Sequence, residues 1–463
     1  MSKPQNKEGF SSALTIFFAT LGSAIGLGNI WKFPYLTGVN GGAAFIIIYL
    51  GFVLILGIPL MLAEFYIGRS TGSNPIGAFD KIKDSKWPKA NKIFKVSGVF
   101  TMITSMFVMF YYSAVAGWVY SYLFKAIKGD FNVLATMNVS DAVNFTKTSF
   151  TQTVSDGKVA VFWQFVVLLI VTIVLAKGVQ KGIEKVTSTL MPVLLVLIVV
   201  CDVRALMLSK AGEGISFLMK PDFSKVSTDM ILTAMGLAFF KLAIAMGVLI
   251  VFSGYYKKDT NLIGISFKVA ISDVVISIMA GLAIFPVVFE FGLNPSEGAG
   301  LLFQSIPLSF AKLPMGNILL IAFFLLTAIA ATTAMISLSE VPVRFLSQQF
   351  NISRKLSVII STSIMFLIGA LTVHPSSIFG GVRIFNKNLF DFFDFTTSNV
   401  LIPITGLLTA IFVGYVINKK SFVNEITNEG ALAKYKGFVN FVLFSLKVLC
   451  PILIILIFIS SFK

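Results

Sequence analysis

The sequence is poor in charged residues. Only 13% of its 463 residues are Asp, Glu, Lys or Arg, whereas about 25% is usual in soluble domains. Hydrophobic residues make up 56%, and the mean hydropathy is +0.89. Runs of about 20 apolar residues, the length that crosses a bilayer as a helix, recur from Phe10 almost to the last residue. The composition therefore predicts a multi-pass membrane protein in a lipid bilayer, with no room for a soluble domain.

Cysteine and histidine are almost absent, which leaves little material for covalent or metal chemistry. Cys201 and Cys450 lie inside apolar runs, where a buried thiol behaves as a small hydrophobe. The single histidine, His374, cannot build a zinc site unaided. We expect no disulfide, no metal and no enzymatic activity, because no acid and base pair or nucleophile is evident apart from Lys241 and Asp273.

Acidic residues are also scarce: 21 carboxylates face 37 Lys and Arg, a net charge of +16. A basic chain can bind nucleic acid, but these lysines occupy short loops rather than one face of a compact domain. The clearest examples are Lys81, Lys83, Lys86, Lys89 and Lys92, then Lys177, Lys181, Lys185, Lys257 and Lys258. Basic loops stay in the cytoplasm, so we expect a bacterial inner-membrane protein with a cytoplasmic N-terminus, no cleaved signal peptide and no nucleic-acid partner.

Apolar runs between turn signals predict an all-α protein of about eleven transmembrane helices. The first five fall near 10–36, 41–68, 92–127, 159–176 and 185–208, and the next five near 229–256, 261–291, 316–346, 355–373 and 392–417. A last helix covers about 437–461, and residues 1–9 form a cytoplasmic tail. Residues 129–158 are expected to be an outer loop, and 294–315 a segment of short helices over the protein.

The first helix of each five-helix set carries a break. One break runs from Gly22 to Asn29 and the other from Lys241 to Gly247. Unwound backbone at membrane depth is tolerated only where it lines a cavity. Matched breaks in two hydrophobic halves therefore indicate a 5+5 inverted repeat, residues 10–208 and 229–417, in a transporter. Glycines that only permit close helix packing are the alternative; Asn29, a buried amide that needs partners, favours the break.

Several motifs extend this pattern. They are GSAIGLGNIWKFP at 22–34, NGG at 40–42, GIPL at 57–60, Glu64 to Arg69, Tyr111-Tyr112, Lys177-Gly178, Lys181 to Glu184, Phe239-Phe240 and Gly281 to Pro286. The chain resembles the neurotransmitter:sodium symporter family, whose bacterial members include the leucine transporter. The resemblance implies the LeuT-like fold with broken helices 1 and 6.

The resemblance also implies a mid-membrane pocket for a small amino acid. Half-helix N-termini there suit a carboxylate. Tyr112 matches the tyrosine that holds the carboxylate, Phe240 matches the lid, and Gly26 stands where monoamine carriers have aspartate. The implied set is Ala24, Gly26, Leu27, Gly28, Val108, Tyr112, Phe239, Phe240, Lys241, Ala243, Met246 and Leu338. Its apolar end predicts a neutral aliphatic, sulfur-containing or aromatic substrate.

Gates and a hinge are implied in the same way. Lys32 and Asp394, or alternatively Asp391, match the charged pair that closes over Phe240, with Tyr111 beside it. The family has arginine where Lys32 stands, and a lysine cannot make the forked contact of a guanidinium. Gly182 and Pro192 match the motif that lets the fifth helix unwind, although Pro192 could equally be a static kink.

The first cation site departs from the family pattern. Its implied ligands are Ala24, Asn29, a hydroxyl whose position Lys241 takes, and Asp273, with Ser272 as an alternative. An ammonium and a sodium ion a few ångströms apart repel strongly in a pocket of low dielectric. We therefore expect the ammonium to replace this sodium; the alternative is that Lys241 snorkels toward water.

The second sodium site is also altered. Carbonyls of Gly22, Ile25 and Ala330 and the hydroxyl of Thr333 remain, but Ala334 replaces a second hydroxyl. Either sodium still acts through this site, or transport has moved toward proton coupling or exchange. Ser277 matches a chloride-site serine, yet Leu237 and Lys241 stand at other ligand positions, so no chloride is expected. We expect no obligate protein partner, and a membrane amino acid sensor remains an alternative.

Overall fold

A computed structural model describes residues 9–292 and 301–461. The first half contains α1 (Ala13–Ala24), η1 (Gly28–Lys32), α2 (Phe33–Val39), α3 (Ala43–Phe52), η2 (Val53–Gly57), α4 (Ile58–Thr71), α6 (Pro88–Lys128), α8 (Gly157–Ala176), η4 (Val179–Glu184) and α9 (Lys185–Leu206). Here α3, η2 and α4 form one continuous span, as do η4 and α9. These spans coincide with the five helices that the sequence predicts for the first repeat.

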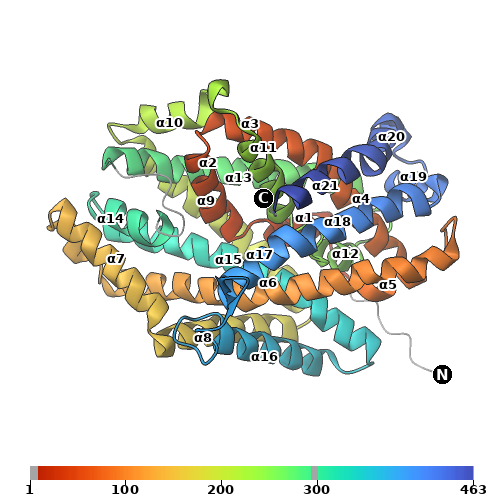
Figure 1. Cartoon of the computed structure of the whole chain (residues 1–463), viewed down its shortest axis with the longest axis horizontal. Coiled ribbons are helices and arrows are strands. Elements are labelled where there is room, and N and C mark those ends of the chain that lie inside the picture. Colours follow the sequence, from red (N-terminus) through yellow and green to blue (C-terminus); the bar gives the residue numbers. More distant parts are fainter. Residues whose placement is uncertain (1–8, 293–300, 462–463) are drawn as a thin grey trace.

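The second half has the same plan. It contains α11 (Thr228–Lys241), α12 (Val248–Ser253), α13 (Leu262–Glu290), α15 (Gly316–Gln349), α16 (Arg354–Thr372), α17 (Leu389–Phe395), η7 (Thr396–Leu401), α18 (Ile402–Ile411) and η8 (Phe412–Val416). A last span follows in η9 (Ala433–Tyr435), α20 (Lys436–Phe444), η10 (Ser445–Leu449) and α21 (Cys450–Ser460). The long helices α6 and α15 pack against each other through the middle of the molecule, with α8 and α16 alongside (Figure 1).

Shorter elements connect the spans. They are α5 (Pro75–Lys81), η3 (Asn132–Ala135), α7 (Val139–Ser155), α10 (Ala211–Met219), η5 (Phe223–Lys225), η6 (Leu301–Ser305), α14 (Ile306–Ala311), an antiparallel hairpin β1 (Arg383–Ile384) and β2 (Lys387–Asn388), and α19 (Lys419–Ile426). The connection at 129–158, expected as an outer loop, contains a 17-residue helix, α7, that the sequence did not predict. Its sequence is polar, so a search for apolar runs could not find it. Of the segment 294–315, residues 301–311 are helical as expected, and 294–300 lie outside the described residues.

Local signals fix the helix ends. Ser12 and Thr15 form a capping box at the start of α1, and the Asn261 side chain caps α13 by accepting from the Gly264 N–H. The 41-residue helix α6 begins with Pro88, which is preorganised for a first turn. It ends at Gly129, whose φ of +80° reverses the chain at little steric cost.

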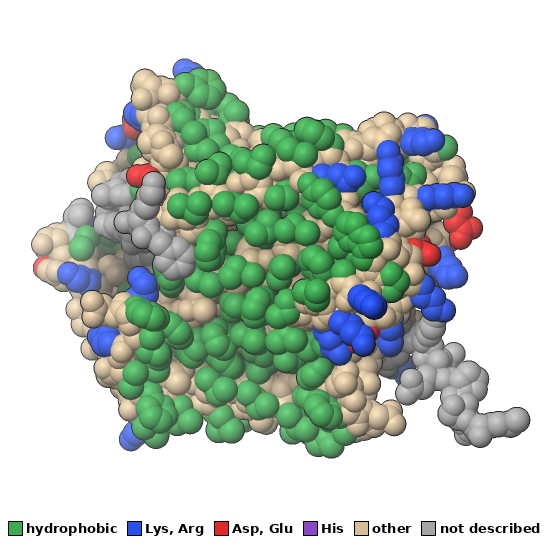
Figure 2. Space-filling model, turned by 45° about the vertical axis from the view of Figure 1, so that its right-hand side comes forward, with side chains coloured by type: hydrophobic (Ala, Val, Ile, Leu, Met, Phe, Trp, Pro, Cys, Tyr) green, Lys and Arg blue, Asp and Glu red, His purple; other side chains and the backbone are tan. Residues whose placement is uncertain are grey.

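Within the described residues, nine helices are long and apolar enough to cross a membrane, and the bent pair formed by α1 and Gly28–Val39 makes a tenth. The sequence predicts eleven. The difference is the span 229–256, which its break divides into α11 and α12, each too short to qualify alone. Figure 2 shows a broad apolar band with lysine and arginine gathered beyond one edge of it, as expected for a protein that faces lipid.

Candidate functional site

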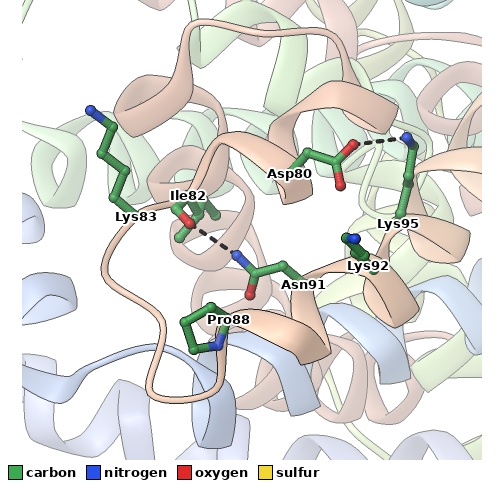
Figure 3. Close-up of a pocket in the computed structure, with 7 residues that line it drawn as sticks. All are labelled: Asp80, Ile82, Lys83, Pro88, Asn91, Lys92 and Lys95. Carbon is green, nitrogen blue, oxygen red and sulfur yellow. Dashed lines mark hydrogen bonds and ion pairs between the residues drawn. The ribbon is translucent and has the colours of Figure 1, made fainter.

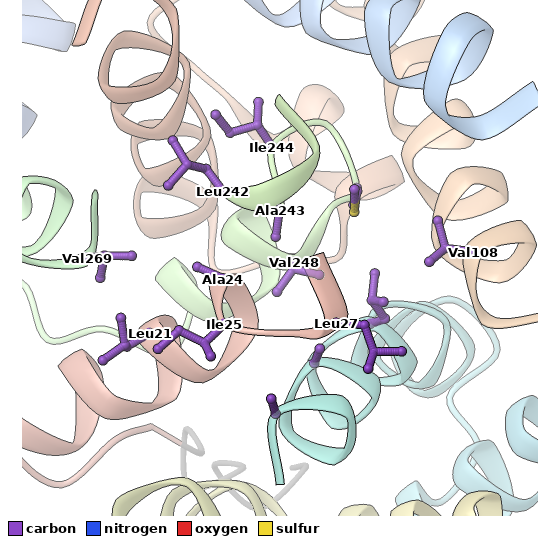
Figure 4. Close-up of a cluster of buried hydrophobic side chains, with 14 of the residues drawn as sticks. Leu21, Ala24, Ile25, Leu27, Val108, Leu242, Ala243, Ile244, Val248 and Val269 are labelled. Atoms are coloured by element: carbon purple, nitrogen blue, oxygen red, sulfur yellow. The ribbon is translucent and has the colours of Figure 1, made fainter. Parts of the chain in front are cut away.

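Two helix breaks meet at the centre of the molecule. The chain bends by 55° between α1 and Gly28–Val39, with Ile25 in an extended conformation. Helix α11 ends at Lys241, and α12 resumes only at Val248. Figure 4 shows the residues of the first break facing those of the second, with Val108 of α6 to one side. Both breaks are buried, so their polar backbone groups need partners.

The second break is held in a strained conformation. Ala243 and Ala245 have φ of 52° and 65°, a region that residues with a Cβ rarely occupy and that costs about 1–3 kcal/mol each. The side chain of Glu64, fully buried on α4, accepts the Ala245 N–H at 2.6 Å. This carboxylate therefore fastens the break to the first repeat, a role that the sequence reasoning did not assign to Glu64.

An enclosed space lies between the breaks and helices α6 and α15. Its volume is about 30 Å³. The lining residues are Ser23, Ala24, Gly26, Gly28, Val108, Tyr112, Phe240, Lys241, Ala243, Met246, Ala334 and Leu338. All the expected substrate residues line it except Leu27 and Phe239. Leu27 contributes its N–H, which donates to the Tyr112 hydroxyl at 2.9 Å, and Phe239 is instead buried against Gly406 of α18.

Ser23 and Ala334 line this space although the sequence reasoning did not place them there. The Ser23 hydroxyl donates to the Thr20 carbonyl at 2.6 Å. Ser23 lies within the predicted break Gly22–Asn29, and that position could have suggested it. Ala334 was assigned to the second sodium site, and its small side chain now also borders the cavity.

Lys241 is fully buried beside that cavity, and its ammonium has a complete set of partners. Nζ lies 2.9 Å from Asp273 Oδ2, donates to the Tyr49 hydroxyl at 3.0 Å and donates to the Ser277 hydroxyl. It also lies 4.5 Å from the centre of the Phe33 ring, a favourable position for a cation. Three donors therefore meet three oxygens, which is the condition under which a buried charge is tolerated.

Asp273 is equally well satisfied. Oδ1 accepts from Asn29 Nδ2 at 2.6 Å, and Oδ2 accepts from the Tyr49 hydroxyl at 2.9 Å. Asn29 also donates to Ser277, and its Oδ1 accepts the Gly26 N–H at 3.2 Å. The structure thus brings together the expected Asn29, Lys241 and Asp273. Ser272 is half-buried and absent from these contacts, whereas Tyr49 completes the group unpredicted.

Of the residues expected at a second sodium site, Gly22 of α1 and Thr333 of α15 lie against each other. A methyl group added at Gly22 would lie 3.4 Å from the Thr333 Cβ, so α1 and α15 touch at this point. The Thr333 hydroxyl lies 3.1 Å from the carbonyls of Ile329 and Ala330. The adjacent Thr332 points away and bonds the Tyr120 hydroxyl at 2.7 Å. Carbonyls and one hydroxyl are hard oxygen donors that suit a sodium ion, with one side-chain ligand fewer where Ala334 stands.

The outer gate is arranged differently from the expected ion pair. Lys32 Nζ lies 4.2 Å over the Phe240 ring. In the described part of the chain Lys32 pairs with neither Asp394 nor Asp391. The Asp394 carboxylate accepts from Ser398 at 3.2 Å, and Asp391 bonds the capping residue Asn388 at 2.8 Å. A cation on an aromatic face needs no forked geometry, which is the contact that a lysine can make.

Tyr111, expected at the outer gate, packs against α17. The Tyr111 ring contacts Phe390 of α17, with ring centres 5.5 Å apart.

Of the two residues of the proposed hinge, Gly182 lies in η4, where a side chain would collide with the Val174 carbonyl. Helix α9 continues through Pro192 without interruption. In this conformation the span from Val179 to Leu206 departs from α-helical geometry in η4, before α9, and not at Pro192.

A polytopic helical protein with two discontinuous helices around a buried cavity belongs to the class of secondary transporters. The family model described as "Sodium:neurotransmitter symporter family" matches residues 7–156 and 132–463. The chain therefore belongs to that family, and it is a membrane transporter and not an enzyme.

Relatives that match over nearly the whole chain support this family assignment. A sodium-dependent transporter of Haemophilus influenzae is 34% identical, covering 99% of this chain and 98% of its own. The sodium-dependent transporter YhdH of Bacillus subtilis is 33% identical, covering 97% of each. The crystal structure of MhsT in complex with L-phenylalanine superimposes with a TM-score of 0.87 at 37% identity, over 98% of this chain and 99% of that one.

Proposed function

We propose that this transporter takes up a neutral amino acid with an apolar side chain by alternating access. The cavity walls supplied by Val108, Met246 and Leu338 are apolar, and a charged side chain would lose its hydration there without gaining a partner. The similar transporter MhsT was crystallised with L-phenylalanine, which supports a substrate of this class.

The polar end of the cavity suits a carboxylate. Tyr112 accepts the Leu27 N–H, which leaves its own hydroxyl proton available to the cavity. Gly28 lines this end of the cavity and opens η1, and the start of a helix favours a negative charge nearby. Gly26 keeps this end open, because a methyl group there would lie 2.7 Å from the Tyr112 oxygen. These groups support a binding place for the α-carboxylate once the space of about 30 Å³ has widened to admit an amino acid.

The buried contact between Lys241 and Asp273 carries our proposal on ion coupling. Two unit charges about 4 Å apart repel by about 4 kcal/mol at an effective dielectric constant of 20. A sodium ion at the first site would meet that repulsion from the ammonium, so Lys241 takes the place of this sodium. The Ser277 hydroxyl donates its only proton to the Asp273 carbonyl at 2.7 Å, so it has none to offer a chloride ion, and we expect no chloride here.

Sodium dependence is therefore weakened or lost, because the second site, formed by carbonyls of Gly22, Ile25 and Ala330 with the Thr333 hydroxyl, also has one hydroxyl fewer where Ala334 stands. The alternative is ordinary sodium-coupled symport through that site alone. It is favoured by the contact between Gly22 and Thr333 and by the names of the relatives. In both cases we place the chain in the bacterial inner membrane with its N-terminus in the cytoplasm, on the side of the basic loops.

Uptake by purified protein in proteoliposomes tests the proposal. Radiolabelled phenylalanine, leucine and methionine should accumulate, and arginine and glutamate should not. Exchange uptake driven by counterflow of unlabelled substrate should persist when choline replaces sodium on both sides, and its loss there would favour ordinary sodium symport. Binding without any uptake would instead identify a sensor, and preferential uptake of a charged amino acid would contradict our assignment of the pocket.

A further inference from the structure

A large hollow lies far from the substrate cavity, between α5 and the start of α6. Its volume is about 620 Å³, and it is lined by Asp80, Ile82, Lys83, Pro88, Asn91, Lys92 and Lys95. Figure 3 shows Lys83 on one side of the hollow, and Lys92 and Lys95 with Asp80 on the other. Three lysines against one aspartate give these walls a net charge of +2. The transport mechanism uses none of these side chains.

Two of the three ammonium groups lack a counter-charge. Lys95 pairs with Asp80 at 2.8 Å. Among the residues that the structure describes, Lys83 and Lys92 form no ion pair with a carboxylate. Two cations held beside one hollow attract an anion with more than one oxygen, such as a phosphate group.

The walls of the hollow are fixed in place. The buried Asn91 donates to the Ile82 carbonyl at 2.9 Å and so ties the start of α6 to the end of α5. The loop between them is bound to the end of η8: Lys86 N–H donates to the Val416 carbonyl at 2.8 Å, and Asn418 N–H, just after η8, donates to the Asp84 carbonyl at 3.0 Å. An anion bound there would meet lysines on a preorganised backbone.

Exposed apolar side chains that adjoin the lining residues in the sequence point to a lipid as the source of the phosphate. On α6, Ile93 is 71% exposed and Val96 is 40% exposed, and Trp87 directly before the helix is 59% exposed. Tryptophan is typical of the membrane interface, and α6 is a membrane-spanning helix. A soluble phosphate would use only the lysines, whereas a phospholipid would also cover the exposed apolar surface.

We propose that this hollow binds the headgroup phosphate of an anionic phospholipid, whose acyl chains lie along Ile93 and Val96. The inference requires only that the chain lies in a membrane. It is independent of the transported substrate and of the coupling ion.

Native mass spectrometry of the purified full chain tests the inference. The protein is titrated with phosphatidylglycerol and, separately, with phosphatidylcholine carrying the same acyl chains. The variant Lys83→Gln/Lys92→Gln removes the two unpaired charges. The control Lys434→Gln/Lys436→Gln removes two exposed charges near the start of α20 that are not part of this hollow. Elution in gel filtration and substrate binding equal to wild type show that each variant is folded.

We expect wild type to retain phosphatidylglycerol in preference to phosphatidylcholine. A lysine near the membrane surface contributes about a factor of five, so the double variant should bind phosphatidylglycerol roughly 30-fold more weakly, and the control should match wild type. Equal losses in both variants, or no loss in either, would overturn the site. Displacement of the lipid by glycerol phosphate at equal concentration would show that the ligand is a soluble phosphate and overturn the lipid assignment.

Discussion

Replacing Lys241 with threonine exchanges a tethered cation for a hydroxyl group. In the wild type the ammonium lies 2.9 Å from Asp273 Oδ2, and both side chains are fully buried. Removing one partner of a buried ion pair costs about 3–5 kcal/mol, because the remaining charge is uncompensated. A sodium ion at the vacated position would compensate Asp273. We therefore expect Lys241→Thr to be unstable in choline and to be stabilised by sodium.

The same substitution should change the number of sodium ions that substrate binding requires. Removing a repulsion of about 4 kcal/mol raises the sodium affinity of the first site about 10³-fold. Wild type then shows at most one sodium ion per bound substrate, from the second site. Lys241→Thr should require one sodium more, which makes the titration of substrate binding against sodium steeper.

The assay is binding of radiolabelled phenylalanine to purified protein, with sodium replaced stepwise by choline at constant ionic strength. The thermal unfolding midpoint is recorded in the same buffers. Lys241→Thr/Asp273→Asn serves as the control for charge, because it removes both members of the pair and should not be destabilised in choline. Lys241→Met removes the charge without supplying an oxygen and should bind sodium more weakly than the threonine variant.

One result would refute the reasoning. If the sodium titrations of wild type and Lys241→Thr coincide in both midpoint and steepness, the ammonium does not occupy the place of a sodium ion. The buried pair would then have a structural role only.

Three further predictions concern other parts of the molecule. Ala334→Ser places a hydroxyl beside Thr333. One more oxygen on the cation is worth about 1.5–3 kcal/mol, so sodium should bind roughly 10- to 100-fold tighter. An unchanged sodium titration would contradict the second site. Gly26→Ala places a methyl group 2.7 Å from the Tyr112 oxygen. Overpacking of about 1–3 kcal/mol should weaken phenylalanine binding roughly 10- to 100-fold without unfolding the protein. Binding with wild-type affinity would show that this cavity is not the substrate site. Burial lowers the pKa of His374 to about 4 from 6.5, so the unfolded chain binds the proton first and the free energy of unfolding falls, by up to about 3 kcal/mol, as the pH drops from 6.5 to 4. The unfolding midpoints of wild type and His374→Gln at pH 7.5 and 4.5 check this, and equal losses in both would disprove it.

Much of the architecture follows from the sequence, because apolar length and helix signals are local. The spans from α3 to α21 begin and end near the predicted residues, and the two breaks lie within Gly22–Asn29 and at Lys241–Gly247 as expected. Where composition misled, the element was not apolar. The helix α7 and the hairpin β1–β2 are polar or very short, so a search for apolar runs could not find them.

The sequence also contained Lys241 and Asp273, because a charge inside an apolar run is visible without a structure. What the ammonium does there depends on Tyr49 and Ser277, which are 192 and 36 residues away along the chain. Nothing in the sequence distinguishes Tyr49, and Ser277 is notable only as a match to a chloride-site serine. Helix packing places them against Lys241, just as it places Lys32 over Phe240 instead of beside Asp394. Partners of a side chain are set by contacts between distant segments, and only the tertiary structure decided them.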